Sequence, residues 1–142
     1  MMKMLIPVDG SNAALGAVDH AVRTAGLYAG GLEVHLLNVQ LPVLSGNVKT
    51  FISQEKLDEY YHDEGMNALK PAKARLDAAG IPCHVHIGVG NIAETILHYA
   101  RANQCDLICM ARSGLGTLSG ILLGSVAARL VHLSEIPVLL VR

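Results

Sequence analysis

The stretch from Met110 to Val126 combines residue types that can bind an anion. It begins in an apolar run, leads into Gly124 and Ser125, and contains three further glycines, Gly114, Gly116 and Gly120. The pattern predicts a strand, a glycine-rich turn and the start of a helix. The first N–H groups of a helix lack partners and carry partial positive charge, and glycine lets the backbone approach a ligand closely. The stretch indicates either a site for a phosphate-bearing ligand or a plain connection between strand and helix.

A carboxylate follows the first apolar run, in the tripeptide Asp9-Gly10-Ser11. At the end of a strand it can accept a hydrogen bond from a ribose or an adenine amine, or help to hold a divalent cation. The alternative, which the motif by itself favours, is a turn residue or a helix cap.

A second glycine pattern lies at 88–93, reading Gly-Val-Gly-Asn-Ile-Ala. It matches the Gly-x-Gly-x-x-Ala fingerprint of dinucleotide-binding proteins, and Arg112 follows where an arginine can accept a 2′-phosphate. The fingerprint normally belongs to the first strand, whereas this one follows the third. A turn and helix cap is therefore the favoured interpretation, and an NAD(P)-dependent enzyme is an alternative.

Other catalytic and metal-binding patterns are incomplete. The stretch Gly120–Ser125 lacks the lysine of a P-loop, which argues against a Walker-type nucleoside triphosphatase. His84 and His86 alternate along one strand and so face one side, but no third metal ligand is apparent at a suitable spacing. No serine or cysteine is paired with an activating base.

The elements that must position these residues follow from the apolar pattern. Strands are predicted at 3–9, 32–39, 82–88, 106–112 and 136–141. Ser11 is predicted to cap a helix that Gly30 and Gly31 stop, and Asn91 to cap a helix that runs to about Ala102. A further helix follows the glycine-rich turn.

The region between the second and third strands begins with a predicted loop at 40–50 and continues as a long helical segment that ends at Gly80. Gly65 and Pro71 lie inside this segment. They predict a kink or two consecutive helices instead of one straight helix.

Strands alternating with helices predict a single α/β domain over residues 1–142, with a five-stranded parallel sheet covered on both faces, a Rossmann-like three-layer sandwich. Ligands bind such sheets at the carboxyl ends of the strands, near the point where the strand order reverses. The residues at or near such ends are Asp9, Val39, Gly88 and Arg112.

Composition narrows the possible partners. Hydrophobic residues make up 51% of the chain and charged residues 16%, the net charge is −1, and there is no tryptophan. Scattered charges and few aromatics argue against nucleic-acid binding, and no apolar run is long enough to span a membrane. Three cysteines do not suggest a disulfide framework. We expect a soluble, cytoplasmic protein.

Five segments together make the whole chain resemble the universal stress protein family. They read Ile-Pro-Val-Asp-Gly-Ser at 6–11, Gly-x-Gly-x-x-Ala-Glu-x-Ile at 88–96, Asp-Leu-Ile-Cys-Met at 106–110, Leu-Leu-Gly-Ser-Val-Ala at 122–127 and Ile-Pro-Val-Leu-Leu-Val at 136–141. The resemblance implies a five-stranded parallel α/β domain that usually forms a homodimer, often by pairing the last strands, here Ile136 to Val141. An apolar edge strand fits such pairing.

The resemblance also implies a division between members that bind ATP and members that do not. The ATP-binding pattern is Gly-x-x-Gly, nine residues, then Gly-Ser or Gly-Thr. The present sequence matches this pattern at Gly114, over residues 115–123 and at the pair Gly124-Ser125. Ala111 replaces the first glycine. The added methyl group can crowd a ribose or phosphate, or disfavour a positive φ, but it leaves the backbone N–H in place.

By resemblance, Asp9 and Val39 contact the adenine base, and Gly114, Gly124 and Ser125 contact the phosphates. The other candidates are Pro7 and Val8 before Asp9, Met110 and Val126 flanking the loop, Ala111 itself, and Arg112 and Ser113, whose side-chain roles we infer from their position.

The leading interpretation is a stress-response protein that binds ATP as a homodimer, with AMP or ADP as alternative nucleotides and Mg²⁺ as a companion ion. Little or no hydrolysis is expected, because the sequence positions no general base. The main alternative is a dimeric interaction protein of the same fold that binds no nucleotide, with Ala111 as the first sign of that loss.

Overall fold

The sheet is built from five parallel strands. The structure, a computed structural model, describes residues 1–43, 53–112 and 124–142. The strands are β1 (Met2–Pro7), β2 (Leu32–Gln40), β3 (Cys83–Val89), β4 (Leu107–Ala111) and β5 (Val138–Val141). Their order in the sheet is β3-β2-β1-β4-β5, and all four pairings are parallel. The predicted α/β class, strand number and parallel sheet are confirmed.

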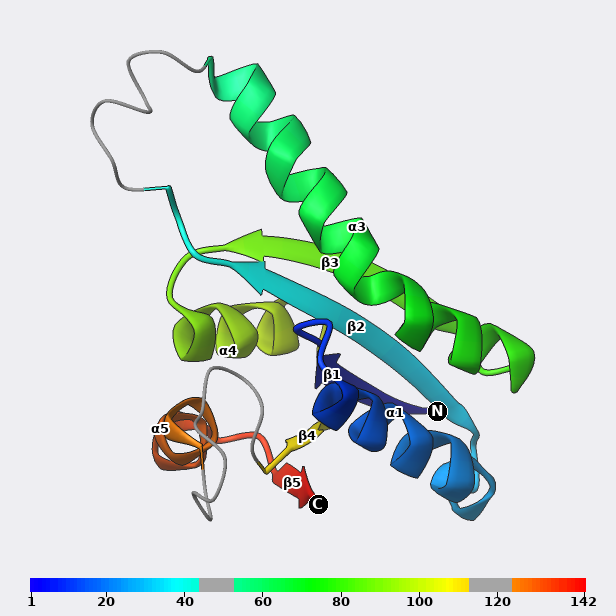
Figure 1. The fold of residues 1–142 in the computed structure, drawn as a ribbon. Coiled ribbons are helices and arrows are strands. Elements are labelled where there is room, and N and C mark those ends of the chain that lie inside the picture. Colours follow the sequence, from blue (N-terminus) through cyan, green and yellow to red (C-terminus); the bar gives the residue numbers. More distant parts are fainter. Residues whose placement is uncertain (44–52, 113–123) are drawn as a thin grey trace.

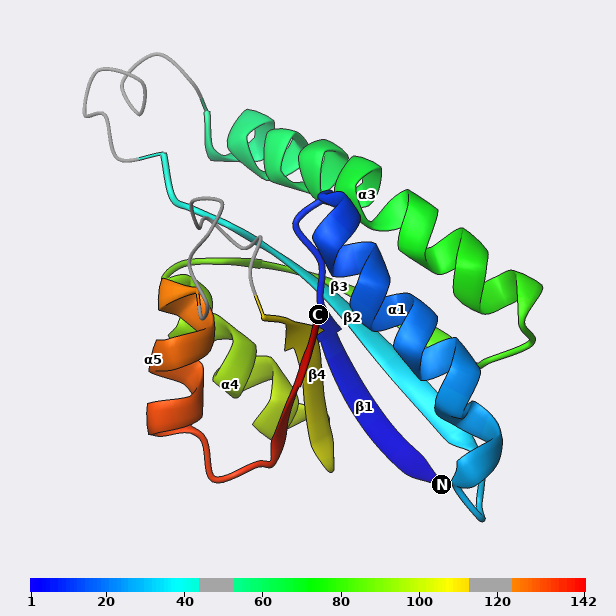
Figure 2. The ribbon, with the colours of Figure 1, turned by 60° about the horizontal axis from the view of Figure 1, so that its bottom comes forward.

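Helices cover both faces of this sheet (Figures 1 and 2). They are α1 (Asn12–Thr24), the 3₁₀ turn η1 (Ala25–Leu27), α3 (Gln54–Ala78), α4 (Ile92–Ala102) and α5 (Ser125–Leu133). One face packs against α1 and α3, and the other against α4 and α5. Within the described ranges, none of these helices has the length and apolar character needed to cross a bilayer.

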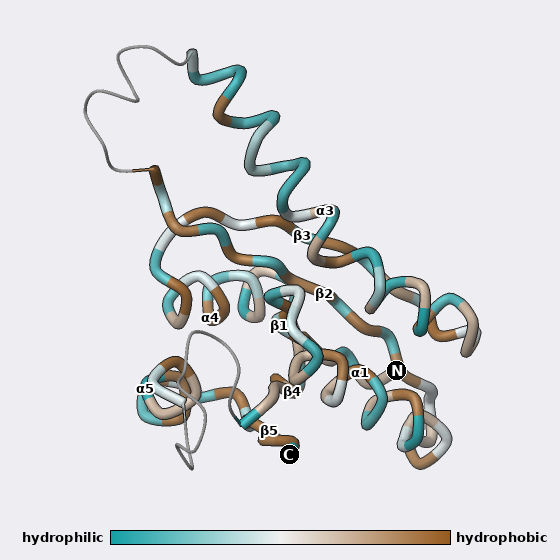
Figure 3. Tube along the Cα trace, in the orientation of Figure 1, coloured by the Kyte–Doolittle hydropathy of each residue, from teal (hydrophilic) through white to brown (hydrophobic). Residues whose placement is uncertain are grey.

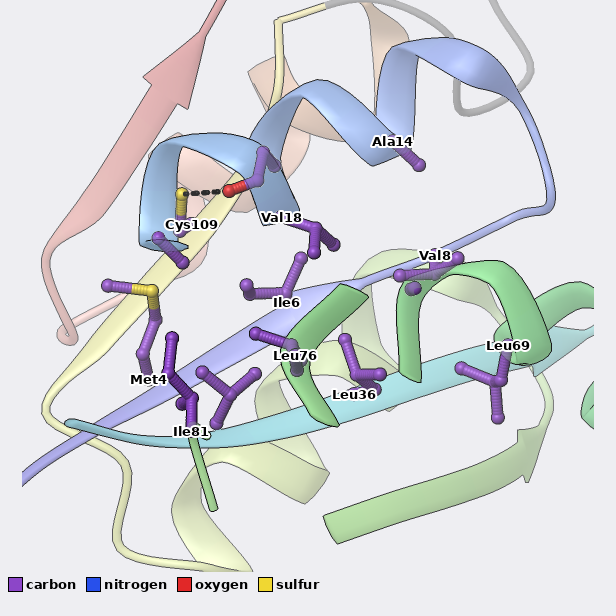
Figure 4. Packing of buried hydrophobic residues seen from close by; sticks show 14 of the residues in the cluster. Met4, Ile6, Val8, Ala14, Val18, Leu36, Leu69, Leu76, Ile81 and Cys109 are labelled. Carbon is purple, nitrogen blue, oxygen red and sulfur yellow. Dashed lines mark hydrogen bonds between the residues drawn. The ribbon is translucent and has the colours of Figure 1, made fainter. Parts of the chain in front are cut away.

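Strand β1 is buried on both faces. Met4 and Ile6 belong to the apolar cluster under α1 and α3, and Leu5 belongs to the cluster under α4 and α5. In Figure 4, Ile6 points toward Val18 of α1, with Leu76 of α3 beside it. Burying one such side chain contributes about 1.5–3 kcal/mol, so the central strand stabilises both layers. Figure 3 shows the hydrophobic residues concentrated along the strands.

The predicted helix starts are confirmed by capping contacts. The Ser11 hydroxyl accepts the N–H of Ala14 at 3.3 Å, and the Asn91 amide oxygen accepts the N–H of Glu94 at 3.4 Å. The predicted end of the first helix is wrong. The helix ends at Thr24, ahead of the predicted stop at Gly30 and Gly31, because the chain tightens into η1 first.

Of the two alternatives predicted for α3, a kink or two consecutive helices, the structure shows the first: α3 is one continuous helix of 25 residues that is not straight (Figure 2). Its axis bends partway along (Figure 2). Pro71 is exposed, so the carbonyl that loses an intrahelical partner there faces water. The helix ends as predicted at Gly80, whose φ of +71° allows the N–H of Ile81 to reach the carbonyl of Leu76 at 3.0 Å.

The three cysteines are free thiols. Cys109 is fully buried under α1, where its Sγ lies 3.9 Å from the carbonyl oxygen of Ala17. Burial raises the pKa of this thiol to about 12. Because the thiolate is the reactive form, Cys109 has the properties of a structural residue.

Candidate functional site

The reversal of strand order beside β1 creates the candidate site. From β1 the chain moves outward to β2 and β3, and it then returns to the other side of β1 as β4. Helix α1, which follows β1, packs on one face, and α5, which follows β4, packs on the other. Diverging connections of this kind leave a crevice at the carboxyl ends of the two strands.

Hydrogen bonds hold the end of β1 in this crevice. Pro7 is the last residue of the strand and is buried. The N–H of Val8 donates to the carbonyl of Leu37 at 2.8 Å. Asp9 is exposed, and its Oδ1 accepts the N–H of Ser11 at 2.9 Å. Gly10, with a φ of +87°, allows this tight turn between Asp9 and Ser11.

Sequence reasoning missed Asn38, which positions this turn. Asn38 is 3% exposed, and its side-chain N–H donates to the carbonyl of Val8 at 2.8 Å. The side-chain N–H of Gln40 in turn donates to the Asn38 amide oxygen. The available signal was an amide between the apolar residues Leu37 and Val39 of a predicted strand, because a buried polar group requires a partner.

The end of β4 and the start of α5 lie directly beside each other. Met110 and Ala111 are buried in β4, and Ala111 is in register with Val141 of β5. The N–H of Arg112 donates to the carbonyl of Val141 at 2.8 Å, and the N–H of Gly124 donates to the carbonyl of Arg112 at 2.9 Å. The candidates Ser113 and Gly114 lie outside the described residues.

Ala111 does not occupy a glycine-only conformation. It is the last residue of β4, and the one positive φ found at a non-glycine position among the described residues belongs to Gln104. The expectation that alanine disfavours a required positive φ is therefore wrong at this position. The remaining difference from glycine is the space that the Ala111 methyl group occupies.

Helix α5 begins without a side-chain cap. Ser11, Ser53 and Asn91 each accept an N–H in the first turns of α1, α3 and α4, whereas α5 is capped by Gly124 with no side-chain hydrogen bond. Gly124 is buried, Ser125 is exposed and Val126 is half-buried. The first N–H groups of a helix have no partner within the helix itself, so this first turn gives α5 the capacity to bind an anion.

A cavity of about 230 Å³ lies where α4 and α5 begin. It is lined by Leu41, Asn91, Ile92, Ala93, Ser125, Val126 and Arg129. Arg129 lies one helical turn beyond Ser125 and contacts the carboxylate of Glu94 on α4. Sequence reasoning missed this arginine, although its spacing from Ser125 puts both on one face of a helix.

The second glycine pattern has a structural role. Val39, half-buried near the end of β2, is in register with Gly88 of β3. Gly88 packs closely on α4, since a Cβ added there would lie 2.7 Å from Thr95 Cγ2. The N–H of Gly90 donates to the carbonyl of Gln40 at 3.0 Å, and its φ is +150°. These contacts fit the predicted turn and cap.

Three histidines and a glutamate gather on the sheet face that carries α4. The pair predicted on one side of β3, His84 and His86, is joined by Glu33 and His35 of β2. The hydrogen bond from His35 lowers the pKa of the Glu33 carboxyl. Burial lowers the pKa of His86, and the neighbouring imidazoles of His35 and His84 act in the same direction.

The strand order, the two helical layers and the crevice beside β1 define a Rossmann-like α/β protein with a candidate ligand site at the carboxyl ends of its strands. The model of the universal stress protein family matches residues 1–142. The chain therefore belongs to the universal stress protein family, and the resemblance drawn from the sequence is confirmed.

Individual relatives share the full length of the chain. Universal stress protein MJ0531 of Methanocaldococcus jannaschii is 34% identical and covers 99% of this chain and 81% of its own length. Among solved structures, the protein MJ0577 matches with a TM-score of 0.83 at 32% identity, over 99% of this chain and 94% of that one. A universal stress protein solved in complex with cAMP matches with a TM-score of 0.72 at 27% identity, over 99% and 97% of the two chains.

Replacing Asn38 by alanine is expected to destabilise the protein by about 1–3 kcal/mol, because the carbonyl of Val8 loses its amide partner in a buried setting. Urea unfolding of both proteins measures this difference. Asn67→Ala serves as the control, since Asn67 is exposed on α3 and its loss should change stability by no more than about 0.5 kcal/mol. Equal losses in the two variants would contradict the role assigned to Asn38.

Proposed function

We propose that this protein binds an adenine nucleotide, with ATP as the preferred form, at the carboxyl ends of β1 and β4, and that it does so as a cytoplasmic stress-response protein. The observation that carries the proposal is the start of α5 at Gly124, a cap residue without a side chain, which the Gly124–Arg112 hydrogen bond holds beside the crevice. The relative solved with cAMP supports an adenine nucleotide as the ligand class.

The proposal assigns the two ends of the nucleotide to different parts of the crevice. The carboxylate of Asp9, held in its turn by Ser11, accepts a hydrogen bond from the adenine amine, and the half-buried Val39 packs against the base. Pro7 and Val8 form the floor beneath Asp9.

The phosphates lie at the start of α5. Backbone N–H groups of the first turn and the hydroxyl of Ser125 donate to them, and the macrodipole of the helix favours their charge. Gly124 leaves room for close approach, while Met110, Ala111 and Val126 border the loop. The proposed phosphate site is completed at the β4 end of that loop by Arg112, Ser113 and Gly114.

Hydrolysis is at most slow. None of the side chains assigned to the site is a base placed to activate water, and phosphoryl transfer requires positive charge positioned around the γ-phosphate. Mg²⁺ accompanies the ATP phosphates as it does in solution, and the proposal requires no dedicated protein ligand for it.

The second candidate function is a dimeric interaction protein without a nucleotide. Ala111 favours it, because its buried methyl group stands where ATP-binding members are expected to have glycine. The two candidate functions assume the same fold and the same dimer. They differ only in whether a nucleotide occupies the crevice.

Isothermal titration calorimetry with Mg²⁺ and ATP is expected to detect binding in the micromolar to sub-millimolar range. Asp9→Asn should weaken it about tenfold or more, because the variant keeps the turn oxygen but presents an amide donor to the adenine amine. Asp63→Asn, on the exposed surface of α3, is the control and should bind like the wild type. Absence of heat at millimolar nucleotide would refute the proposal.

The variant Ala111→Gly separates the two candidate functions. We expect its affinity for ATP to change less than about tenfold, since Ala111 retains its N–H and lies in a strand conformation that alanine adopts readily. The same calorimetric titration provides the measurement. If glycine instead creates binding that the wild type lacks, the methyl group blocks the crevice and the interaction protein becomes the better description.

Homodimerisation through the C-terminal strand is part of the same proposal. β5 is an edge strand whose four residues are all half-buried, so the chain leaves apolar surface along that edge. The carbonyls of Pro137 and Val141 face β4. Because backbone groups alternate along a strand, the N–H groups of Val138 and Leu140 face the open edge.

Light scattering after size-exclusion chromatography should give twice the chain mass of 15.0 kDa for the wild type. Leu140→Pro should shift the protein toward the monomer, because proline removes an edge N–H donor. Leu140→Ala loses the same side chain but keeps that donor, so it should remain dimeric. A monomeric wild type, or equal behaviour of the two variants, would show that β5 pairing does not hold a dimer.

A further inference from the structure

The cross-strand cluster of Glu33, His35, His84 and His86 has no part in the proposed nucleotide site. His35 is in register with His84 on the neighbouring strand, and its ring stacks between the other two imidazoles, with centroids 4.9 Å from His84 and 5.2 Å from His86. His35 lies four residues before Val39, or roughly 13 Å along the strand. The cluster is therefore a separate feature of the sheet.

Three potential ligand atoms of the cluster lie close together. The Nε2 atom of His35 lies 2.8 Å from a carboxylate oxygen of Glu33, and the Nε2 atom of His84 lies 3.7 Å from the other oxygen. One ligand atom from each of the three residues lies within 4.8 Å of the rest. A tetrahedral ion with bonds of about 2.0–2.1 Å separates its ligands by roughly 3.3–3.5 Å. Small rotations of the Glu33 and His84 side chains give that spacing.

The burial of these side chains suits an ion that enters from solvent. His35 is 6% exposed, and its ring is held by the surrounding side chains, while the side chains of Glu33 and His84 are 20% and 56% exposed. Because the exposed side chains of Glu33 and His84 can move, an ion can reach the buried His35 from solvent. Three protein ligands leave the fourth coordination position for water.

His86 occupies the position of an outer-shell partner. Its Nε2 atom lies 2.9 Å from Nδ1 of His35. A bound ion replaces the hydrogen between His35 Nε2 and Glu33; with its hydrogen on Nδ1, His35 then donates to His86, and its Nε2 lone pair is directed at the ion. Metal-binding histidines commonly donate their second ring N–H in this way, which fixes both tautomer and ring orientation. The ring of His86 is itself held against Tyr99 of α4, with centroids 5.6 Å apart.

We propose that Glu33, His35 and His84 form a binding site for a divalent transition-metal ion, with Zn²⁺ as the expected occupant, and that His86 orients His35 within it. Two imidazole nitrogens and one carboxylate oxygen are the ligand set that zinc accepts in three-ligand sites. Mg²⁺ and Ca²⁺ prefer oxygen ligands, so they are poor occupants. Cu²⁺ and Ni²⁺ bind the same donors, so titrations in which each ion competes with Zn²⁺ for the protein distinguish the three ions.

The proposal is tested with the full chain, prepared without a polyhistidine tag, stripped with EDTA and titrated with Zn²⁺ in the absence of nucleotide. We expect one equivalent to bind, and a Co²⁺-loaded sample to show the intense visible absorption of tetrahedral coordination. A parallel titration with Mg²⁺ should produce no binding. Because no nucleotide is present, the result is independent of whether ATP binds at the crevice.

Variants assign the ligands. Glu33→Gln and His84→Ala should each weaken Zn²⁺ binding by more than the 10–100-fold that loss of an outer-shell partner costs. His98→Ala is the matched control, because His98 is an exposed histidine on α4 and should not affect binding. Circular dichroism confirms that each variant is folded. Zn²⁺ binding that is absent from the wild type, or that survives both ligand substitutions, overturns the proposal.

A second pair of variants isolates the positioning role of His86. His86→Phe keeps a ring in the stack but removes the acceptor, so Zn²⁺ affinity should fall about 10–100-fold. His86→Gln retains an acceptor and should recover much of that affinity. If the two variants bind Zn²⁺ equally well, His86 supports only the packing of the sheet.

Discussion

Burial of β1 on both faces is the constraint on which the rest of this structure depends. Met4, Leu5 and Ile6 are all 0% exposed, so the strand requires helices above and below it and a strand on each side. Its six residues pair with β2 along their whole length, and β4 pairs on the opposite side. A central first strand forces the chain to reverse direction across the sheet, and the crevice exists because of that reversal.

The same constraint determines how precisely Asp9 is placed. A carboxylate just beyond a strand has many conformations unless the backbone before it is held. Here Val8 is held on both sides, since its N–H bonds Leu37 and its carbonyl bonds the amide of Asn38. Asn38 is itself buried in β2, so an error in the register of β1 and β2 would leave two buried polar groups without partners. Fold and candidate site are thus specified by the same hydrogen bonds.

Much of this fold was predictable because its signals are local. Apolar runs locate the strands, and Ser11 and Asn91 mark helix starts by side chains that need only the next turn of backbone. The continuity of α3 was not predictable, because the cost of Pro71 depends on which face of the helix meets water. The end of α1 at Thr24 likewise depends on how the chain tightens before β2.

Features that depend on strand order were the hardest to predict. His35 and His86 are 51 residues apart in sequence, and they meet only because β2 and β3 are neighbours in register. The alternation of His84 and His86 was visible in the sequence, but the pairing that adds Glu33 and His35 was not. For the candidate nucleotide site, Asp9, Val39 and Gly124 were predictable as strand ends and a helix start, whereas Asn38 required knowledge of which strand lies beside β1.

Strand β2 links the two candidate sites while keeping them distinct. On the face toward α4 it carries Glu33, His35, Leu37 and Val39 in alternating positions, and along β2 the fully buried Leu37 lies between His35 and the rim. On the neighbouring strand β3, His86 lies in register with Leu37, so the cluster extends to that level of the sheet. Helix α4 spans the same interval, with Tyr99 against His86 near one end and Asn91 and Ile92 lining the cavity at the other. Helix α4 therefore contacts both candidate sites, and a displacement of this helix is one physical route by which occupancy of one site can influence the other.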